Sequence, residues 1–311
     1  PPAAPLRMSF DAKTWLLVAL GAITVFHLYT LGSAIRRKRA EAGQGPATGV
    51  APSPLGIGIG FITNFFDTLG VGSFATTTTL FRFFKTVPDE RIPGTLNVGH
   101  TLATIVQAFI YTQAVEVEST TLILMIVAAV LGAWLGAGVV GNWPKRRIQM
   151  GMGICLLVAA GLTVLQALNI APGGGEAIAV EGVKLGAALV GNFLLGALMT
   201  LGIGLYGPCM ILISLLGMNP KAAFPIMMGS CAFLMPIASQ RFSVMGRFDL
   251  KAAFGLIVGG IPAVLIAALI VKSLPLVYVR WLVVIVVLYT AITLLRSARQ
   301  QPAAAPTPEP A

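Results

Sequence analysis

The sequence predicts an all-α polytopic membrane protein, in which an N-terminal anchor helix precedes two inverted repeats, each made of a re-entrant broken-helix hairpin and three transmembrane helices. Three observations lead to this prediction. The 311-residue chain is 56% hydrophobic, only 10% charged and has a mean hydropathy of +0.87, which is more than a soluble domain can cover with polar surface. Apolar stretches of membrane-spanning length recur along it. A glycine-containing pentapeptide occurs twice.

The formal charge of +10 would suggest a nucleic-acid partner in a soluble chain, but here lysine and arginine lie in short runs between apolar stretches. That distribution is typical of the loops of membrane proteins, so we expect no nucleic-acid binding. Cys155, Cys209 and Cys231 lie within apolar segments without paired or metal-like spacing. We therefore expect no disulfide framework, no metal site and no cofactor.

The N-terminal region divides into a tail, an anchor and a linker. Residues 1–13 are rich in proline and alanine, and we expect them to be disordered. Residues 14–39 form the anchor, because the apolar run is long enough to cross a bilayer and stops at the basic run Arg36–Arg39. A cleaved signal peptide would carry its charges before the apolar run, so we expect a retained helix that begins outside and ends in the cytoplasm. Residues 40–54 are typical of a flexible linker.

Six uninterrupted apolar spans follow, each about 20 residues or one bilayer thickness. They are Pro93–Gln113, Leu122–Val140, Ile148–Leu168, Ala222–Gln240, Ala252–Val271 and Leu276–Leu295. Two further segments, Gly56–Phe84 and Leu185–Leu216, contain the repeated pentapeptide as TLGVG and TLGIG, 132 positions apart. Their arms on either side of the glycines reach roughly 16 to 26 Å against a bilayer core of about 30 Å. Each segment is therefore too long for one helix and too short for two full spans.

Two interpretations compete for these segments: a kinked helix that crosses the membrane, and a re-entrant hairpin that returns to the side from which it entered. If both are hairpins, fifteen lysines and arginines lie on the cytoplasmic side against five outside. If both cross, the same residues divide ten to ten. Cytoplasmic loops carry the excess of positive charge, so we expect hairpins.

Each half then has one hairpin and three spans, an odd number of crossings, so the second half must lie inverted relative to the first. The predicted boundaries are 55–170 for the first repeat, 171–182 for the loop between repeats, 183–297 for the second repeat and 298–311 for a disordered cytoplasmic tail. Gly99-His100 matches Gly229-Ser230 at a similar offset. Inverted repeats with broken helices are typical of secondary transporters, whose substrate site lies near the midplane.

The two breaks predict an anion site. The returning arm of each hairpin begins at mid-membrane, so its unpaired N–H groups and positive dipole end face the site. The alternative is that the glycines only let helices pack closely, and we expect the GxGxG at Gly56–Gly60 to be such a packing face rather than a nucleotide loop. The candidates for binding at the breaks are Gly70, Gly72, Ser73, Gly202, Gly204, Tyr206 and Gly207.

Polar and thiol side chains at membrane depth are further candidates, because an unpaired polar group in lipid costs free energy. For substrate binding these are Thr76, Thr77, His100, Cys209 and Ser230. The threonines can instead bond back to their own helix, and His100 can be a satisfied core histidine. Asp67 and His100 are the candidates for proton coupling, with a structural hydrogen bond or a position nearer the aqueous edge as the alternative for Asp67.

On these residues the chain resembles the sulfite exporter TauE/SafE family, also called the 4-toluene sulfonate uptake permease family. The resemblance covers roughly 56–295 and rests on the duplicated hairpins, GVGSF and GIGLYGP, each followed by a span of small residues. Ser73 and Leu205 stand where members of the family have a richer glycine run. The resemblance implies transport of sulfite, sulfoacetate or other sulfonates, with export across the bacterial inner membrane.

Three function classes stay open. A secondary transporter that uses alternating access and proton coupling is preferred, because no nucleotide-binding motif indicates a pump. A passive anion channel, or an uptake permease for a small carboxylate or sulfonate, is the alternative. An intramembrane enzyme or a subunit of a larger complex is the third class, although no HExxH, GxSxG or paired intramembrane carboxylates indicate an enzyme. The expected partners are a small anion, the lipid bilayer and a coupling proton, and a homo-oligomer is compatible with the sequence.

Overall fold

The computed structural model describes residues 12–41, 51–69, 72–168, 170, 175–202, 204–270 and 276–300. The helices in this part of the chain are α1 (Ala12–Glu41), α2 (Pro54–Thr68), α3 (Ser73–Phe83), α4 (Ile92–Ala114), α5 (Ser119–Val140), α6 (Lys145–Ala167), α7 (Gly182–Met199), α8 (Tyr206–Leu215), α9 (Ala223–Val244), α10 (Leu250–Ile270) and α11 (Leu276–Gln300). Short 3-10 helices, η1 (Asp89–Arg91) and η2 (Pro220–Ala222), precede α4 and α9. The prediction of an all-α protein is confirmed.

The helices follow the predicted segments. The anchor is α1, the six spans are α4, α5, α6, α9, α10 and α11, and the two glycine segments are split into α2 with α3 and α7 with α8. Five of the described helices are long and apolar enough to cross a membrane, at Thr14–Lys38, Ser119–Val140, Gly182–Met199, Ala223–Val244 and Leu250–Leu269. The third of these is α7, so this arm is longer than the sequence indicated.

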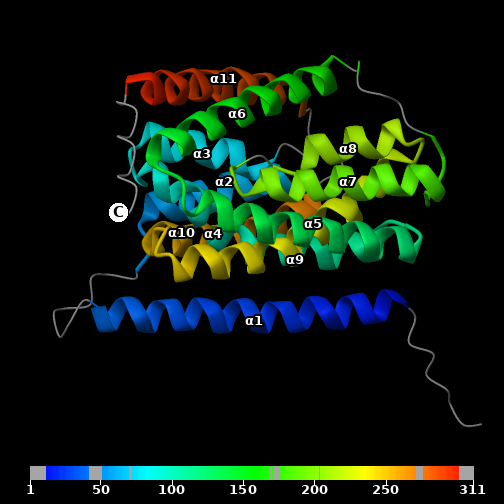
Figure 1. Ribbon diagram of the computed structural model, residues 1–311, viewed down its shortest axis with the longest axis horizontal. Helices are drawn as coiled ribbons and strands as arrows, with labels where there is room; N and C mark the ends of the chain where they lie inside the picture. The colour runs from blue at the N-terminus through cyan, green and yellow to red at the C-terminus, as the bar shows by residue number, and fades with distance from the viewer. Residues whose placement is uncertain are drawn as a thin grey trace, which may run out of the picture.

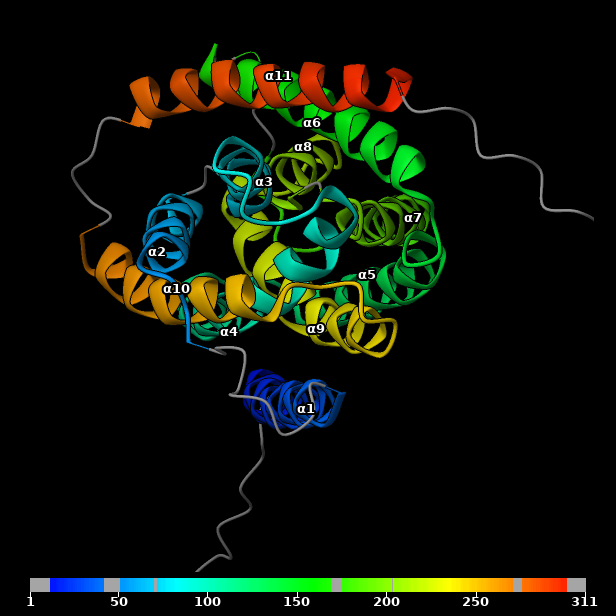
Figure 2. The same cartoon turned by 90° about the vertical axis from the view of Figure 1, so that its left-hand side faces the viewer.

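The helices of the two halves pair with one another in a regular way. The most extensive contacts join α2 with α10, α7 with α5, α4 with α9 and α6 with α11. If each helix of the first half is replaced by its counterpart in the second half, α2 by α7, α3 by α8 and so on to α6 by α11, and the reverse, the same four pairs result. In Figure 1, α2 and α3 lie in the left half of the view and α7 and α8 in the right half. Figure 2 shows α1 below the bundle, with α6 and α11 across its opposite side.

Glycines let the paired helices approach closely. A Cβ on Gly60 of α2 would lie 2.7 Å from the carbonyl oxygen of Gly255 in α10, and a Cβ on Gly132 of α5 would clash with the carbonyl oxygen of Phe193 in α7. Small residues at such positions are typical of helix packing in membranes. The predicted packing face is confirmed at Gly60 but is wrong at Gly58, where a Cβ would meet nothing within 4 Å. Gly58 lies two residues before Gly60, so its side-chain direction differs by about 200° around the helix and points away from α10.

Contacts between loops gather one set of helix ends together. Lys38, near the end of α1, donates to the carbonyl of Phe248 over 3.2 Å, and the N–H of Asp249 donates to the hydroxyl of Thr95 over 2.9 Å. The start of α4 therefore lies beside the start of α10. The start of α2 lies there too, because Gly56 packs against the first turns of α10. The segment α2–α3 thus begins and ends at the same end of the molecule.

A second set of contacts gathers the opposite helix ends. The N–H of Asn219, after α8, donates to the carbonyl of Ala177, before α7, over 2.8 Å. The N–H of Glu118, before α5, donates to the carbonyl of Ile178 over 3.0 Å. The segment α7–α8 thus also begins and ends at one end, which it shares with the start of α5.

Candidate substrate site between two helix breaks

Each glycine-rich segment breaks at a glycine with a left-handed backbone. Gly72 has φ +84° and directly precedes α3, and Gly202 has φ +99° in the turn after α7. A side chain strains this conformation, so both positions favour glycine. Gly204 has no such angle, and a Cβ on it would meet nothing within 4 Å. Among the described glycines of the two breaks, Gly72 and Gly202 share this backbone, whereas the aligned pentapeptides pair Gly72 with Gly204 and Gly70 with Gly202. Gly70 lies outside the described residues.

A small cavity lies between the two breaks and is lined from both halves of the chain. Its volume is about 20 Å³, room for about one water molecule. The first half contributes Asp67, Gly72, Ser73, Phe74 and Thr104, and the second half contributes Met199, Gly204, Leu205, Met227, Met228 and Cys231. Four predicted site residues, Asp67, Gly72, Ser73 and Gly204, therefore meet here.

The first break carries a carboxylate at the start of its returning helix. Oδ1 of Asp67 accepts a hydrogen bond from the N–H of Ser73 over 2.7 Å, and Oδ2 accepts one from Nε2 of Gln107 over 3.1 Å. Nε2 of Gln107 also donates to the hydroxyl of Thr68 over 2.9 Å. A buried carboxylate is costly unless it is hydrogen-bonded, and these donors with the positive end of α3 meet that need.

The second break lacks an equivalent carboxylate. Met199 occupies the place that corresponds to Asp67 in the aligned pentapeptides, and its sulfur lies 3.6 Å from that of Cys231. The N-cap of α8, Leu205, makes no side-chain cap hydrogen bond. Tyr206 and Gly207 lie in the first turn of α8, and their surroundings are outside what the structure describes. Cys209 in the same turn is fully buried and lies outside the cavity wall.

His100 lies behind the cavity and is fully hydrogen-bonded. Its Nδ1 lies 3.0 Å from Oδ1 of Asn64, and its Nε2 lies 3.0 Å from the hydroxyl of Thr77. Nδ2 of Asn64 donates to the carbonyl of Gly60, so Oδ1 of Asn64 is the acceptor and Nδ1 of His100 carries the proton. Nε2 then accepts from Thr77. The neutral imidazole thus links α2, α3 and α4.

The remaining predicted residues bond within the protein. The hydroxyl of Thr76 donates to the carbonyls of Gly72 and Ser73 over 3.1 and 2.9 Å, the back-bonding that the sequence left open. The hydroxyl of Ser230 accepts from Nδ2 of Asn192 over 3.0 Å. Ser230 and Asn192 therefore join α9 to α7, as His100 and Asn64 join α4 to α2.

Thr104 is a site residue that was not predicted from the sequence. Thr104 lies one helical turn after His100, is 4% exposed and lines the cavity. Among the described residues its hydroxyl has no hydrogen-bond partner. Its spacing from His100 and Gln107 on one face of the span was the signal available in the sequence. The apolar neighbours of the cavity, such as Met227 and Phe74, carried no such signal because apolar residues fill every span.

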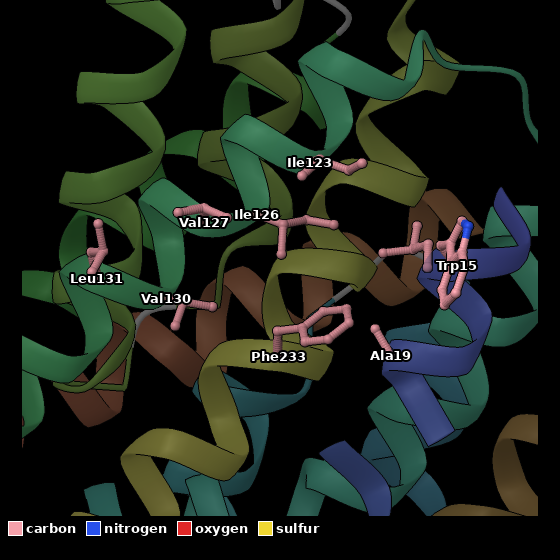
Figure 3. Close-up of a pocket in the computed structure, with 9 residues that line it drawn as sticks. Trp15, Ala19, Ile123, Ile126, Val127, Val130, Leu131 and Phe233 are labelled. Carbon is pink, nitrogen blue, oxygen red and sulfur yellow. The ribbon is translucent and has the colours of Figure 1, made fainter. Parts of the chain in front are cut away.

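A larger cavity is lined almost wholly by apolar side chains and lacks the set of hydrogen-bond donors that an anion needs. It measures about 510 Å³ and lies between α1, α5 and α9. Figure 3 shows its wall, formed by apolar side chains such as Ile126, Val130 and Phe233 with Trp15 at one end. Within the described part of the chain, no three His, Cys, Asp or Glu residues are grouped to hold a metal ion.

Comparison with protein families connects the chain with transport. The sequence profile of the sulfite exporter TauE/SafE family matches residues 3–163, which is just over half of the chain. The chain belongs to this family. TauE/SafE members are transporters, so the protein is a multi-pass membrane transport protein. Comparison with curated proteins and with solved structures gives no match.

The TauE/SafE match includes one break and excludes the other. It runs from residue 3, ahead of α1, to residue 163 near the end of α6, so it covers Asp67, Gly72, His100 and Thr104. The predicted resemblance, roughly 56–295, is confirmed up to residue 163 and has no support from the profile beyond it. The second break enters the candidate site through the geometry of the cavity alone.

Proposed function

We propose that this chain is a secondary transporter of small organosulfur or sulfur-oxyanion compounds, such as sulfite, sulfoacetate or other sulfonates. It exports them across the cytoplasmic membrane by alternating access. The observation that carries the proposal is the cavity whose wall comes from both helix breaks, in a chain of a sulfite exporter family. The junction of two broken helices is where secondary transporters hold substrates and coupling ions.

We propose further that α2–α3 and α7–α8 are re-entrant hairpins from opposite membrane faces, and that the two halves form an inverted repeat. The loop contacts support this, since each segment begins and ends at one end of the molecule and the two ends differ. The exchange symmetry of the helix pairs supports it as well. The returning arms α3 and α8 have 11 and 10 residues, or about 16 and 15 Å, roughly half of a bilayer core.

In this mechanism the oxyanion lies between the two returning arms. The donors on the cavity wall around it are the hydroxyl of Thr104 and the N–H of Ser73 at the start of α3, and Gly204 and Leu205 bring the start of α8 to the same wall. Gly72 and Gly204 keep Cβ atoms out of its approach. The small volume of the cavity corresponds to a closed conformation, so the two halves must move relative to each other before substrate enters from either side.

The orientation that we propose has the N-terminus outside and the C-terminus in the cytoplasm. It places the basic loops on the cytoplasmic side. Labelling of single cysteines in intact cells should find residues 91 and 145–147 accessible from the cytoplasm, and residues 116, 118 and 176 from outside. Labelling of residues 91 and 116 from the same side would overturn the hairpins.

The function is tested with purified protein in liposomes. Vesicles loaded with sulfite or sulfoacetate should accumulate the labelled anion from outside against its gradient, and the initial rate should saturate. Flux that never saturates and runs only downhill would replace the transporter with a passive anion channel. Transport into cells, with no efflux from preloaded cells, would replace export with an uptake permease for a small carboxylate or sulfonate.

A further inference from the structure

The carboxylate of Asp67 occupies the position that an external anion would take at the start of α3. One of its oxygens holds the N–H of Ser73, the first residue of an 11-residue helix, over 2.7 Å. Unpaired N–H groups and the helix dipole make this the strongest anion-binding position of the first break. The chain thus supplies its own anion at the place where the proposed function puts the substrate.

The groups around Asp67 supply no compensating cation. Tyr111 of α4 faces it with a hydroxyl that donates to the carbonyl of Thr68 over 2.6 Å. His100, on the same helix, has both ring nitrogens engaged with Asn64 and Thr77. On the other packed elements, Cys231 and Arg241 belong to α9, Cys209 to α8, Arg82, which pairs with Asp89, to α3, and the exposed Lys251 to the start of α10. The described charged and titratable groups of α11, which packs against α3, and of α7 are all exposed: Tyr289, Arg296 and Arg299 on α11, and Lys184 on α7. The described ion pairs do not include Asp67.

A second observation indicates that the cavity beside Asp67 takes a ligand. Thr104 is 4% exposed and lines this cavity, yet its hydroxyl has no partner among the described residues. A hydroxyl that borders a cavity and donates to no described protein group can donate to an acceptor placed in that cavity. An oxyanion is an acceptor at every oxygen.

We propose that Asp67 is an internal competitor of the transported anion, and that the substrate reaches the N–H of Ser73 only when a proton neutralises Asp67. The proposal rests on the proposed function and adds the means of coupling. One proton adds to a carboxylate oxygen and no other bond is made or broken. The neutral carboxyl no longer repels the oxyanion, and Ser73 is free to donate to it. One proton therefore binds with each anion, and in export the two leave together, driven by the outward gradient of the anion.

This scheme fixes the sign and slope of the pH dependence. Only the protonated form of Asp67 admits the substrate, and above its pKa in the protein that form falls about tenfold per pH unit. The Kd of an anion of constant charge therefore rises about tenfold per pH unit in that range and is constant below it. Methanesulfonate is a suitable probe, because its sulfonate stays ionised between about pH 5 and pH 8 and does not titrate itself.

The experiment measures methanesulfonate and sulfite binding to the full chain in detergent by calorimetry across that pH range. Wild type is titrated in buffers of different ionisation enthalpy, so that proton uptake per bound anion is counted directly. Asp67→Asn should bind methanesulfonate with a Kd independent of pH and at least as low as that of wild type at the lowest pH. The matched control is Asp249→Asn, because Asp249 caps α10 by accepting from the N–H of Ala252 over 2.8 Å and lies away from the cavity. It should keep the wild-type pH dependence.

Uptake of about one proton per methanesulfonate by wild type, lost in Asp67→Asn, is the expected result. Binding without proton uptake would overturn the proposal and leave the proposed function intact. So would an Asp67→Asn variant that keeps the wild-type slope. The wild-type proton count decides the matter even if Asp67→Asn fails to fold. Binding of neither anion at any pH by folded wild type and Asp249→Asn would instead overturn the proposed function, and this proposal with it.

Discussion

The two helix breaks share a backbone plan and differ in their chemistry. Gly72 and Gly202 both take left-handed angles, and each break is followed by a helix of ten or eleven residues. Asp67 stands at the first break and Met199 at the second. The first half therefore supplies hydrogen-bonding groups to the cavity, and the second half supplies sulfur and apolar side chains. Both breaks bring a helix start to the cavity, but the carboxylate lies in the first half alone.

The same asymmetry appears one layer behind the cavity. His100 joins Asn64 to Thr77 through two hydrogen bonds, whereas Ser230 accepts from Asn192, which also donates to the carbonyl of Met125 over 2.7 Å. Both arrangements fix the arm before a break to the following span. The first half does this with an imidazole and the second half with a single hydroxyl.

The largest losses of stability should come from substitutions of the glycines at which helices of the two halves pack. Both halves use such glycines in the same way. Gly60→Val and Gly132→Val would each drive a side chain into the backbone of a neighbouring helix. We expect each to lower the free energy of unfolding by about 3 kcal/mol, measured by unfolding in detergent. Gly58→Val is the control and should change it by less than about 0.5 kcal/mol, because that position is open. Equal losses for Gly58→Val and Gly60→Val would refute the pairing of α2 with α10.

The next largest losses of stability should separate the two hydrogen-bonded links behind the cavity, at His100 in the first half and at Ser230 in the second. His100→Ala leaves Oδ1 of Asn64 and the hydroxyl of Thr77 each without their hydrogen bond to the imidazole, and should cost about 2 to 3 kcal/mol of stability. Ser230→Ala removes one acceptor from an amide that keeps a second one, and should cost about 1 kcal/mol. Both values come from thermal or denaturant unfolding of the purified variants. A larger cost for Ser230→Ala would mean that the second half, and not the first, is the more tightly fixed.

The breaks themselves should respond according to their backbone angles. Gly72→Ala and Gly202→Ala each place a Cβ on a left-handed residue, and should cost about 1 to 2 kcal/mol. Gly204→Ala should be nearly neutral for stability, because its Cβ meets open space. Unfolding measurements on the three variants decide the match. Equal costs at Gly202 and Gly204 would restore the alignment in which Gly204 is the counterpart of Gly72.

The smallest effect lies outside the membrane, at the start of α5. Glu118 accepts hydrogen bonds from the N–H groups of Thr121 and Thr120, which lower its pKa from 4.5 to about 2. A lowered pKa in the folded state means that the stabilisation is complete above the unfolded value and is lost as pH falls from about 4.5 to about 2. Glu118→Gln should therefore flatten the fall of melting temperature in this window. The change should be small, because the side chain lies at the surface. An identical fall in the variant would exclude this cap.

The sequence predicted the helices and the breaks, because both depend on local signals. Span length, basic runs and the repeated pentapeptide are all readable along the chain. The position of Gly58 was predicted wrongly, because which face of α2 meets α10 depends on partners two hundred residues away. The hydrogen bond from Ser73 to Asp67 could not be predicted, because it depends on how the chain turns at Gly72. The place of Thr104 in the cavity wall could not be predicted either, because it depends on how α4 is rotated relative to the breaks.

The central claim is that an oxyanion binds in the cavity between the two breaks. Its most direct test compares the Kd of sulfite and methanesulfonate for wild type, Thr104→Val and Thr63→Val. The hydroxyl of Thr63 donates to the carbonyl of Ile59 over 2.8 Å and lies outside the cavity wall, so Thr63→Val is the matched control. Thr104→Val should raise the Kd roughly 10- to 100-fold, the worth of one hydrogen bond to a charged group, with a melting temperature no lower than that of wild type. A Kd that is unchanged in Thr104→Val would contradict the claim.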